Sequence, residues 1–330
     1  MFAVTFSRPG DPDVLEWSSV DLASPGPGDV VIEVAAAGIN NADLLQRRGL
    51  YRVPNGASPV LGLEVSGVIG WVGTGVTDWF VGDEVCALLA GGGYAEQVVV
   101  SADLLLPVVD GISVVAAAAL PEAVCTVYSN LAMTTRLHSG QTLLVHGGGS
   151  GIGTMAIQWA KAIGASVIAT AGSASKLDGC LALGADVAIN YHTDDFVEET
   201  RAATAGRGAD VILDIVGPSY LNRNLDALAT DGHLVVIGST GAAEPPQLDL
   251  SVLMAKRATI SATTLRARPH EQKAAIIAEV RREVWPLIAS GRIRPVIDSI
   301  ISMDNAAAGH TLLATGSAFG KVVLTPPPAT

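Results

Sequence analysis

The sequence has 330 residues, of which 49% are hydrophobic and 16% are charged. A chain of this length exceeds what one hydrophobic core usually holds, so we expect two domains. The hydrophobic content excludes general disorder. With 32 acidic and 20 basic side chains the net charge is −12. This charge argues against nucleic-acid binding, because it repels a phosphate backbone.

We see no uninterrupted apolar run of the roughly 20 residues that cross a bilayer. The first residues, Met1 to Val4, lack the basic flank and the long apolar stretch of a secretory signal. We therefore expect a cytoplasmic protein without a membrane partner. Cys86, Cys125 and Cys180 are far apart in the sequence, which favours small buried side chains over a disulfide framework or a zinc lobe.

The two ends of the chain and its centre show different patterns. The first 120 residues contain short β-branched runs, bounded by glycine, proline and aspartate, at 30–35, 67–72 and 97–100. From Gln141 onward short apolar strands alternate with helical stretches, at 143–146, 167–170, 187–190, 211–215 and 234–237. This alternation predicts a parallel, doubly wound α/β sheet.

The helices between these strands have the expected period. One apolar stripe consists of Met155, Ala156, Trp159, Ala160 and Ile163. A sixth strand is predicted at 259–264, then a charged helix at 269–288, then short strands and turns up to residue 324. A β-rich beginning and a mixed ending around an α/β centre predict that residues 1–120 and 265–330 form one domain and residues 121–264 the other.

A glycine-rich turn follows the first strand of the central domain. It contains Gly147, Gly148, Gly149, Gly151 and Gly153, with a predicted helix behind it. Such a turn lets the backbone approach a pyrophosphate, and the free amides and dipole of the helix start stabilise its charge. Ser150 stands where the strict dinucleotide motif has its middle glycine, so the alternative is an ordinary glycine turn. The surrounding strands favour a dinucleotide site.

The end of the second central strand distinguishes NAD from NADP. An NAD enzyme carries an acidic residue about 20 residues after the glycine turn, where it binds the ribose 2′-hydroxyl. Here residues 170–176 contain no acid. Ser173 can hydrogen-bond a 2′-phosphate and Lys176 can neutralise it, so we expect NADPH as the cofactor. The alternative for Lys176 is a solvated helix charge.

With these residues in view, the chain resembles the zinc-independent quinone oxidoreductases of the medium-chain dehydrogenase/reductase family, and most closely the tumour-suppressor-inducible group. The similar stretches are 36–43, 46–51, 61–67, 116–122, 170–176 and 265–268. The resemblance implies a GroES-like β-rich barrel domain built from both chain ends, a Rossmann domain in the centre, and a homodimer formed through the Rossmann sheets.

The resemblance also implies a site without metal. Zinc-dependent relatives carry a cysteine ligand near position 38 and a histidine before the glutamate of a Gly-His-Glu motif. This chain has Gly38 and, in Gly62-Leu63-Glu64, a leucine that cannot bind zinc. Hydride transfer is then expected to proceed without a metal Lewis acid, which suits a quinone because its carbonyls are already electrophilic.

The cofactor residues implied by the resemblance are distributed along the whole chain. Those near the nicotinamide are Asn40, Thr126, Gly238, Ser239, Thr264, Leu265, Gly320 and Lys321. Those at the pyrophosphate are Ser150, Gly151 and Ile152, and those around the adenosine phosphate are Gly172, Ser173, Lys176 and Tyr191. For Tyr191 the alternative is a surface tyrosine at a strand end.

For the substrate the resemblance points to Tyr51, whose phenol can donate a hydrogen bond to a carbonyl that becomes an oxyanion. A plain loop tyrosine is the alternative. Asp43 is a weaker candidate, and His146 is expected to pack beside the cofactor. We therefore expect NADPH-dependent reduction of a small-molecule quinone or activated carbonyl. Reduction of an enone or enoyl-thioester double bond, and an NADPH-binding sensor with little turnover, stay open.

Overall fold

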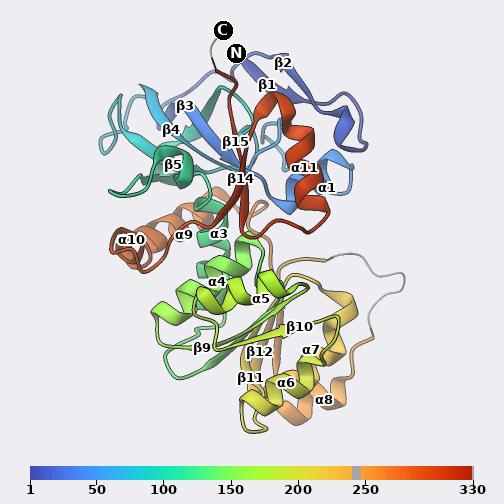
Figure 1. Ribbon diagram of the computed structural model, residues 1–330. Helices are drawn as coiled ribbons and strands as arrows, with labels where there is room; N and C mark the ends of the chain where they lie inside the picture. The colour runs from blue at the N-terminus through green and yellow to red at the C-terminus, as the bar shows by residue number, and fades with distance from the viewer. Residues whose placement is uncertain (240–246, 329–330) are drawn as a thin grey trace. The chain divides into compact units, whose positions relative to one another are not determined.

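The computed structural model describes residues 1–239 and 247–328, and the chain divides into two compact units. We call residues 1–125, 265–290 and 295–330 the terminal unit, and residues 126–264 and 291–294 the central unit. Each is built around its own sheet (Figure 1).

The central unit contains a six-stranded sheet in the order β10-β9-β8-β11-β12-β13, with every neighbouring pair parallel. The strands are β8 Thr142–Val145, β9 Ser166–Ala171, β10 Val187–Asn190, β11 Ala209–Asp214, β12 Leu228–Val236 and β13 Thr259–Ala262. This is the strand order of a Rossmann sheet. The predicted doubly wound fold is therefore confirmed.

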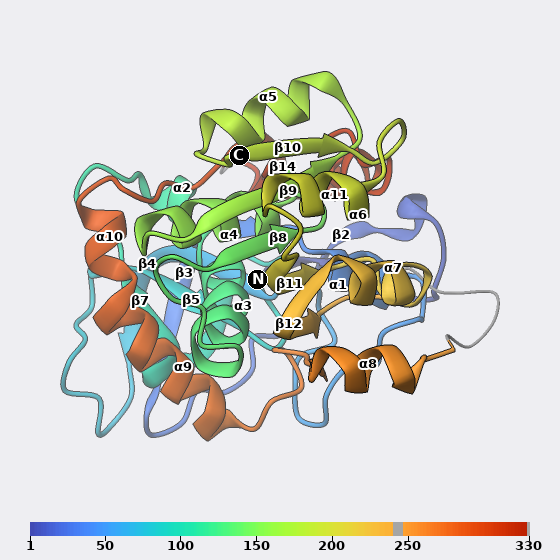
Figure 2. The same cartoon turned by 90° about the horizontal axis from the view of Figure 1, so that it is seen from below.

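The helices of the central unit connect successive strands and pack on the sheet (Figures 1 and 2). They are α4 Gly151–Ala162, α5 Ala174–Ala182, α6 Phe196–Ala203, α7 Leu221–Ala227 and α8 Leu250–Lys256, with a short 3-10 turn at Pro218–Tyr220. Leu144, Ile168 and Ile212 of the strands pack with Phe196 of α6 in one buried cluster. Burial of these apolar side chains holds the helices on the sheet.

The terminal unit is built on a seven-stranded sheet and a separate β1-β2 hairpin. Its strands are β1 Phe2–Thr5, β2 Glu16–Ser19, β3 Asp29–Gly38, β4 Glu64–Val72, β5 Glu84–Leu88, β6 Gln97–Ser101, β7 Leu105–Pro107, β14 Ile297–Ser302 and β15 Lys321–Thr325. The C-terminal strand β15 pairs antiparallel with β3. Residues from both ends of the chain thus share one sheet.

The helices of the terminal unit are α1 Asn41–Arg47, α2 Val114–Ala117, α9 His270–Glu283, α10 Trp285–Ala289 and α11 Ala306–Ala314, and α3 Pro121–Val127 begins in it. Short 3-10 turns lie at Pro12–Val14, Ala102–Leu104 and Met303–Asn305. The β-rich pattern expected for the first 120 residues did not include α1, whose start is stabilised by a capping box between Asn40 and Asp43.

Two further boundaries differ from those predicted. The single helix expected at 269–288 is two helices, because Pro286 at the start of α10 has no N–H to continue the α9 hydrogen-bond ladder. The strand expected at 259–264 ends at Ala262. Buried, unpaired thiols at Cys86, Cys125 and Cys180 confirm the prediction for the cysteines.

One helical run is longer and more apolar than the sequence analysis allowed. The segment Val114–Thr134 comprises α2, α3 and a π-helical turn at Tyr128–Thr134, and its length and composition would suffice to cross a membrane. Its most apolar window is 83% buried within the structure. A core helix of a globular protein has the same properties, so the segment is weak evidence for a membrane span.

Close packing of β4 against β3 yields a test of the fold. A side chain at Gly67 would overlap the backbone carbonyl of Glu33, whereas one at Gly70, on the same strand, would meet only the flexible Glu33 carboxylate. We expect Gly67→Ala to lower the free energy of unfolding by about 1–3 kcal/mol and Gly70→Ala to change it much less. Urea unfolding of both variants measures this difference, and equal effects would contradict the described strand packing.

Candidate functional site

The glycine turn of the central unit connects β8 to α4. Ser150 is the N-cap of α4, and its Oγ accepts a hydrogen bond from the amide of Gly153 at 3.0 Å. Gly151 and Ile152 occupy the first turn of the helix and are half-buried. Amides in this position have no partner within their own helix, and the helix dipole favours an anion beside them. The turn therefore fits the pyrophosphate of a dinucleotide.

Behind the turn, His146 joins three strand ends through a chain of hydrogen bonds. The Asn224 amide group donates to Asp214 at 3.0 Å, so its carbonyl oxygen faces His146 Nε2 at 2.7 Å and that nitrogen carries the proton. His146 Nδ1 then accepts from the Thr170 hydroxyl at 3.2 Å, and this hydroxyl accepts from the amide of Gly147 at 3.3 Å.

Asp214, at one end of this series of hydrogen bonds, is also held in place. Asp214 accepts hydrogen bonds from the amides of Val216 and Gly217, at 2.7 and 3.0 Å. Burial lowers the pKa of His146 to about 4, so the imidazole is neutral, as the hydrogen bonds require. The packing role expected for His146 is thus a specific one: it orients the residues beside the glycine turn.

The predicted adenosine-phosphate residues lie at the end of β9 and the start of α5. Ser173 is the N-cap of α5, and its Oγ faces the amide of Lys176 at 3.4 Å. Lys176 follows in the first turn and is half-buried. Tyr191 lies with its hydroxyl against Gly172, its ring is tilted against that of His192 with 4.5 Å between the ring centres, and it is 42% exposed. The structure thus brings Gly172, Ser173, Lys176 and Tyr191 together.

The other central residues of the predicted site are more dispersed. Gly238 and Ser239 follow β12 and lie against Gly217, at the turn that follows β11. Thr126 is buried on α3, and its carbonyl accepts hydrogen bonds from Ser129 and Asn130. Thr264 follows β13 and is exposed. Their contacts with nicotinamide stay predictions.

The remaining predicted cofactor residues belong to the terminal unit, where two of them meet. Lys321, 5% exposed, donates from Nζ to the carbonyl of Ile39 at 3.0 Å and to Asn40 Oδ1 at 2.6 Å, and it pairs with Glu64 at 2.5 Å. Asn40 Nδ2 donates to Glu64 at 2.9 Å. Gly320 precedes Lys321, and Leu265 is buried. In this structure the Lys321 ammonium is held by three oxygen atoms.

Beside this network lies Asp43, the weaker candidate of the sequence analysis. It accepts hydrogen bonds from the amides of Asn40 and Gly62, at 2.8 and 3.0 Å, and from the Tyr94 hydroxyl at 3.1 Å. Burial nevertheless raises its pKa to about 6. These contacts make Asp43 a structural residue that fixes the start of α1.

The residues that would bind zinc do not fit a metal. Any side chain at Gly38 would collide with the Glu64 carboxylate, and Leu63 is buried, with 1% exposed. No cluster of three histidine, cysteine or acidic side chains occurs within residues 1–239 and 247–328. The cation beside Glu64 is the Lys321 ammonium.

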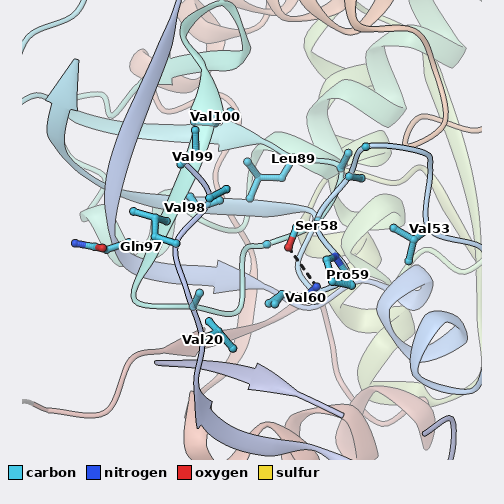
Figure 3. Close-up of a pocket in the computed structure, with 18 of the residues that line it drawn as sticks. Val20, Val53, Ser58, Pro59, Val60, Leu89, Gln97, Val98, Val99 and Val100 are labelled. Atoms are coloured by element: carbon cyan, nitrogen blue, oxygen red, sulfur yellow. Dashed lines mark hydrogen bonds between the residues drawn. The ribbon is translucent and has the colours of Figure 1, made fainter. Parts of the chain in front are cut away.

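Tyr51 lines a large cavity of the terminal unit. Figure 3 shows part of the wall of this cavity. The cavity has a volume of about 1040 Å³, large enough for a small organic substrate. Its wall includes the aliphatic side chains of Leu22, Val53, Val60, Leu88, Leu89, Val98, Val100 and Leu104, and the polar ones of Gln46, His270 and Lys273. The guanidinium of Arg266 lies 5.5 Å from the centre of the Tyr51 ring.

Four charged residues of this unit were missed from the sequence: Glu64, Glu122, Arg266 and Lys273. Lys273 precedes Ile276, Ile277 and Val280 at helical spacing, so a charge interrupts the buried stripe of α9. Arg266 belongs to one of the stretches that carry the family resemblance. Glu64 and Glu122 also lie in such stretches, at 61–67 and 116–122, but nothing in the sequence distinguished a buried carboxyl from an exposed one.

Two family models and several known proteins match this chain. The alcohol dehydrogenase GroES-like domain family matches residues 26–110, and the zinc-binding dehydrogenase family matches residues 151–281. A quinone oxidoreductase of Pseudomonas aeruginosa is 32% identical, over 98% of this chain and 99% of its own. A 2-haloacrylate reductase of a Burkholderia species is 30% identical, over 99% of each chain. The crystal structure of Escherichia coli quinone oxidoreductase complexed with NADPH covers 99% of this chain and 100% of its own, at 31% identity and a TM-score of 0.87.

The buried carboxyl of Glu122 yields a prediction for pH. Burial, with Glu64 nearby, raises its pKa to about 8, against the opposing effect of Lys321 and Arg266. The folded state then keeps a proton that the unfolded chain loses near pH 4.5, so stability falls as the pH rises through this window. Relative to Glu122→Gln, wild type should lose up to ~4 kcal/mol between pH 5 and pH 8.5. Urea unfolding of both proteins at pH 5 and 8.5 measures the difference, and parallel curves would contradict it.

The absence of ligands at Gly38 and Leu63 yields a prediction for metal. We expect the purified protein to contain no stoichiometric zinc and to keep its oxidoreductase activity after treatment with a chelator. Elemental analysis by mass spectrometry provides the measurement. A content of about one zinc per chain, lost together with activity on chelation, would contradict the metal-free site.

Proposed function

The chain belongs to the quinone oxidoreductase family of the medium-chain dehydrogenases/reductases, and we propose that it reduces a quinone with NADPH and without a metal. The observation that carries the coenzyme is the β9–α5 corner. Ser173 and Lys176 stand there in place of the acidic residue that an NAD enzyme needs. A carboxylate would repel the 2′-phosphate, whereas this pair can bind it.

When bound, NADPH supplies the hydride for the reduction. Ser150, Gly151 and Ile152 would hold the pyrophosphate at the start of α4, and Tyr191 would flank the adenosine with Gly172. The hydrogen bonds of His146 to Thr170 and Asn224 hold the residues beside the glycine turn in place. Asn40, Thr126, Gly238, Ser239, Thr264, Leu265, Gly320 and Lys321 are proposed for the nicotinamide side.

Tyr51 is proposed to donate a hydrogen bond to the reduced oxygen of the acceptor. It lines the cavity, and the cation of Arg266 beside its ring favours negative charge nearby. In this assignment the domain of residues 1–120 and 265–330 binds the substrate, and the domain of residues 121–264 binds NADPH.

A second candidate reaction is reduction of an activated carbon–carbon double bond. The similarity to a 2-haloacrylate reductase, at 30% identity over 99% of both chains, favours it. The same hydride donor and a similar tyrosine acid would serve both reactions.

The coenzyme assignment can be tested at Lys176. Charge-assisted hydrogen bonds are worth roughly 1.5–3 kcal/mol, so Lys176→Ala should raise the Michaelis constant for NADPH roughly tenfold to a hundredfold and leave that for NADH nearly unchanged. Lys161→Ala is the matched control, since Lys161 pairs with Asp186 on the same unit. Equal losses for NADPH and NADH would make Lys176 a structural residue.

The proposed assembly is a cytoplasmic homodimer. Strand β13 forms an edge of the central sheet and pairs only with β12 among the described residues. An unpaired edge favours addition of a second copy. Light scattering at micromolar concentration should give the mass of two chains. A monomeric mass would refute this assembly.

A further inference from the structure

Lys273 of α9 is a buried cation that lines the Tyr51 cavity. Its side chain is only 8% exposed. It forms no hydrogen bond or ion pair within the part of the chain that the structure describes. Burial lowers its pKa, which shows the cost of keeping an ammonium away from water. Such a group needs an anionic or polar partner.

Arg266 is a second buried cation beside the same cavity. It is 2% exposed, and its Nε donates to the carbonyl of Ala90 at 2.8 Å. Its Nη1 and Nη2 have no hydrogen-bond partner among the described residues. Ala90 and Tyr51, which the guanidinium contacts, both line the cavity. Both nitrogens are buried, so Arg266 supplies a positive charge behind the cavity wall rather than a surface that a ligand can contact.

The acidic groups around these cations do not neutralise them. Asp103 pairs with His270 at 2.8 Å, and Asp43 is engaged by Asn40, Gly62 and Tyr94. Glu122 is the acid that acts on Lys273, but burial raises the pKa of its carboxyl to about 8 and leaves one of its oxygens without a hydrogen-bond partner among the described residues. Asp21 also lines the cavity, but it forms no ion pair with Lys273 among the described residues.

We propose that Lys273 binds the carboxylate of an acceptor that occupies the Tyr51 cavity. The ligand class is an apolar body with one carboxylate, because the rest of the wall is largely aliphatic, as Val53, Val60 and Val98 illustrate in Figure 3. This inference deepens the proposed function and rests on it, since it names the substrate class of the same site.

The test compares two acceptors, 1,4-naphthoquinone and its 2-carboxylate, in NADPH oxidation by the full chain, and each variant is compared with wild type so that the intrinsic reactivity of the two quinones cancels. The measured quantity is the ratio of kcat/KM for the carboxylate to that for the neutral quinone. Lys273→Met should lower this ratio about tenfold or more, because a charge-assisted contact to the carboxylate is lost. Lys273→Arg should restore most of it. Arg281→Met, which removes an exposed charge from the same helix, is the matched control.

A Lys273→Met variant that slows both quinones by the same factor would overturn the inference, because Lys273 would then make no contact that is specific to the carboxylate. A lack of rescue by arginine would overturn it as well. If neither quinone is reduced, the proposed function fails first. Calorimetric titration of naphthalene-2-carboxylate then decides the inference separately: binding to wild type that is lost in Lys273→Met supports it, and no binding to wild type refutes it.

Discussion

The neutral imidazole of His146 is the constraint on which the central unit depends. Its two nitrogens connect Thr170 at the end of β9 with Asn224 of α7, and through Asn224 with Asp214 at the end of β11. Because both ring nitrogens and Asp214 are fully buried, each bond lost would leave a polar group unpaired, at about 1–3 kcal/mol. The carboxyl ends of three parallel strands are thereby held in register around the glycine turn, and this is the edge where a doubly wound sheet binds its ligand.

In the terminal unit the corresponding constraint is a buried carboxylate that must be neutralised. Glu64 is fully buried at the junction of β3, β4 and β15, and the Lys321 ammonium and the Asn40 amide satisfy its carboxylate. A lysine of the C-terminal strand thus neutralises an acid of the N-terminal half. The same arrangement fixes Asn40, whose Oδ1 accepts from the lysine. A protein-supplied cation can hold such a site without metal, and it leaves the chemistry to the acceptor and the hydride donor.

The central sheet could be predicted because its strands are continuous apolar runs and its turn residues are glycines, which are local signals. Ser173 and Lys176 could be assigned to a phosphate because their place after β9 follows from the strand order. Helix α1 was not predicted, because its capping box, formed by Asn40 and Asp43, lies in a stretch that otherwise has a β-like pattern. The partners of Lys321 and Glu64, and the isolation of Arg266 and Lys273, depend on long-range contacts, which no local pattern encodes.

The central claim is that the chain turns over NADPH with a quinone as acceptor. Absorbance at 340 nm, followed with purified protein, 1,4-naphthoquinone and either NADPH or NADH, tests this claim most directly. The account predicts quinone-dependent oxidation of NADPH with a kcat/KM well above that for NADH. Binding of NADPH without its oxidation by any quinone would contradict the claim, as would a clear preference for NADH.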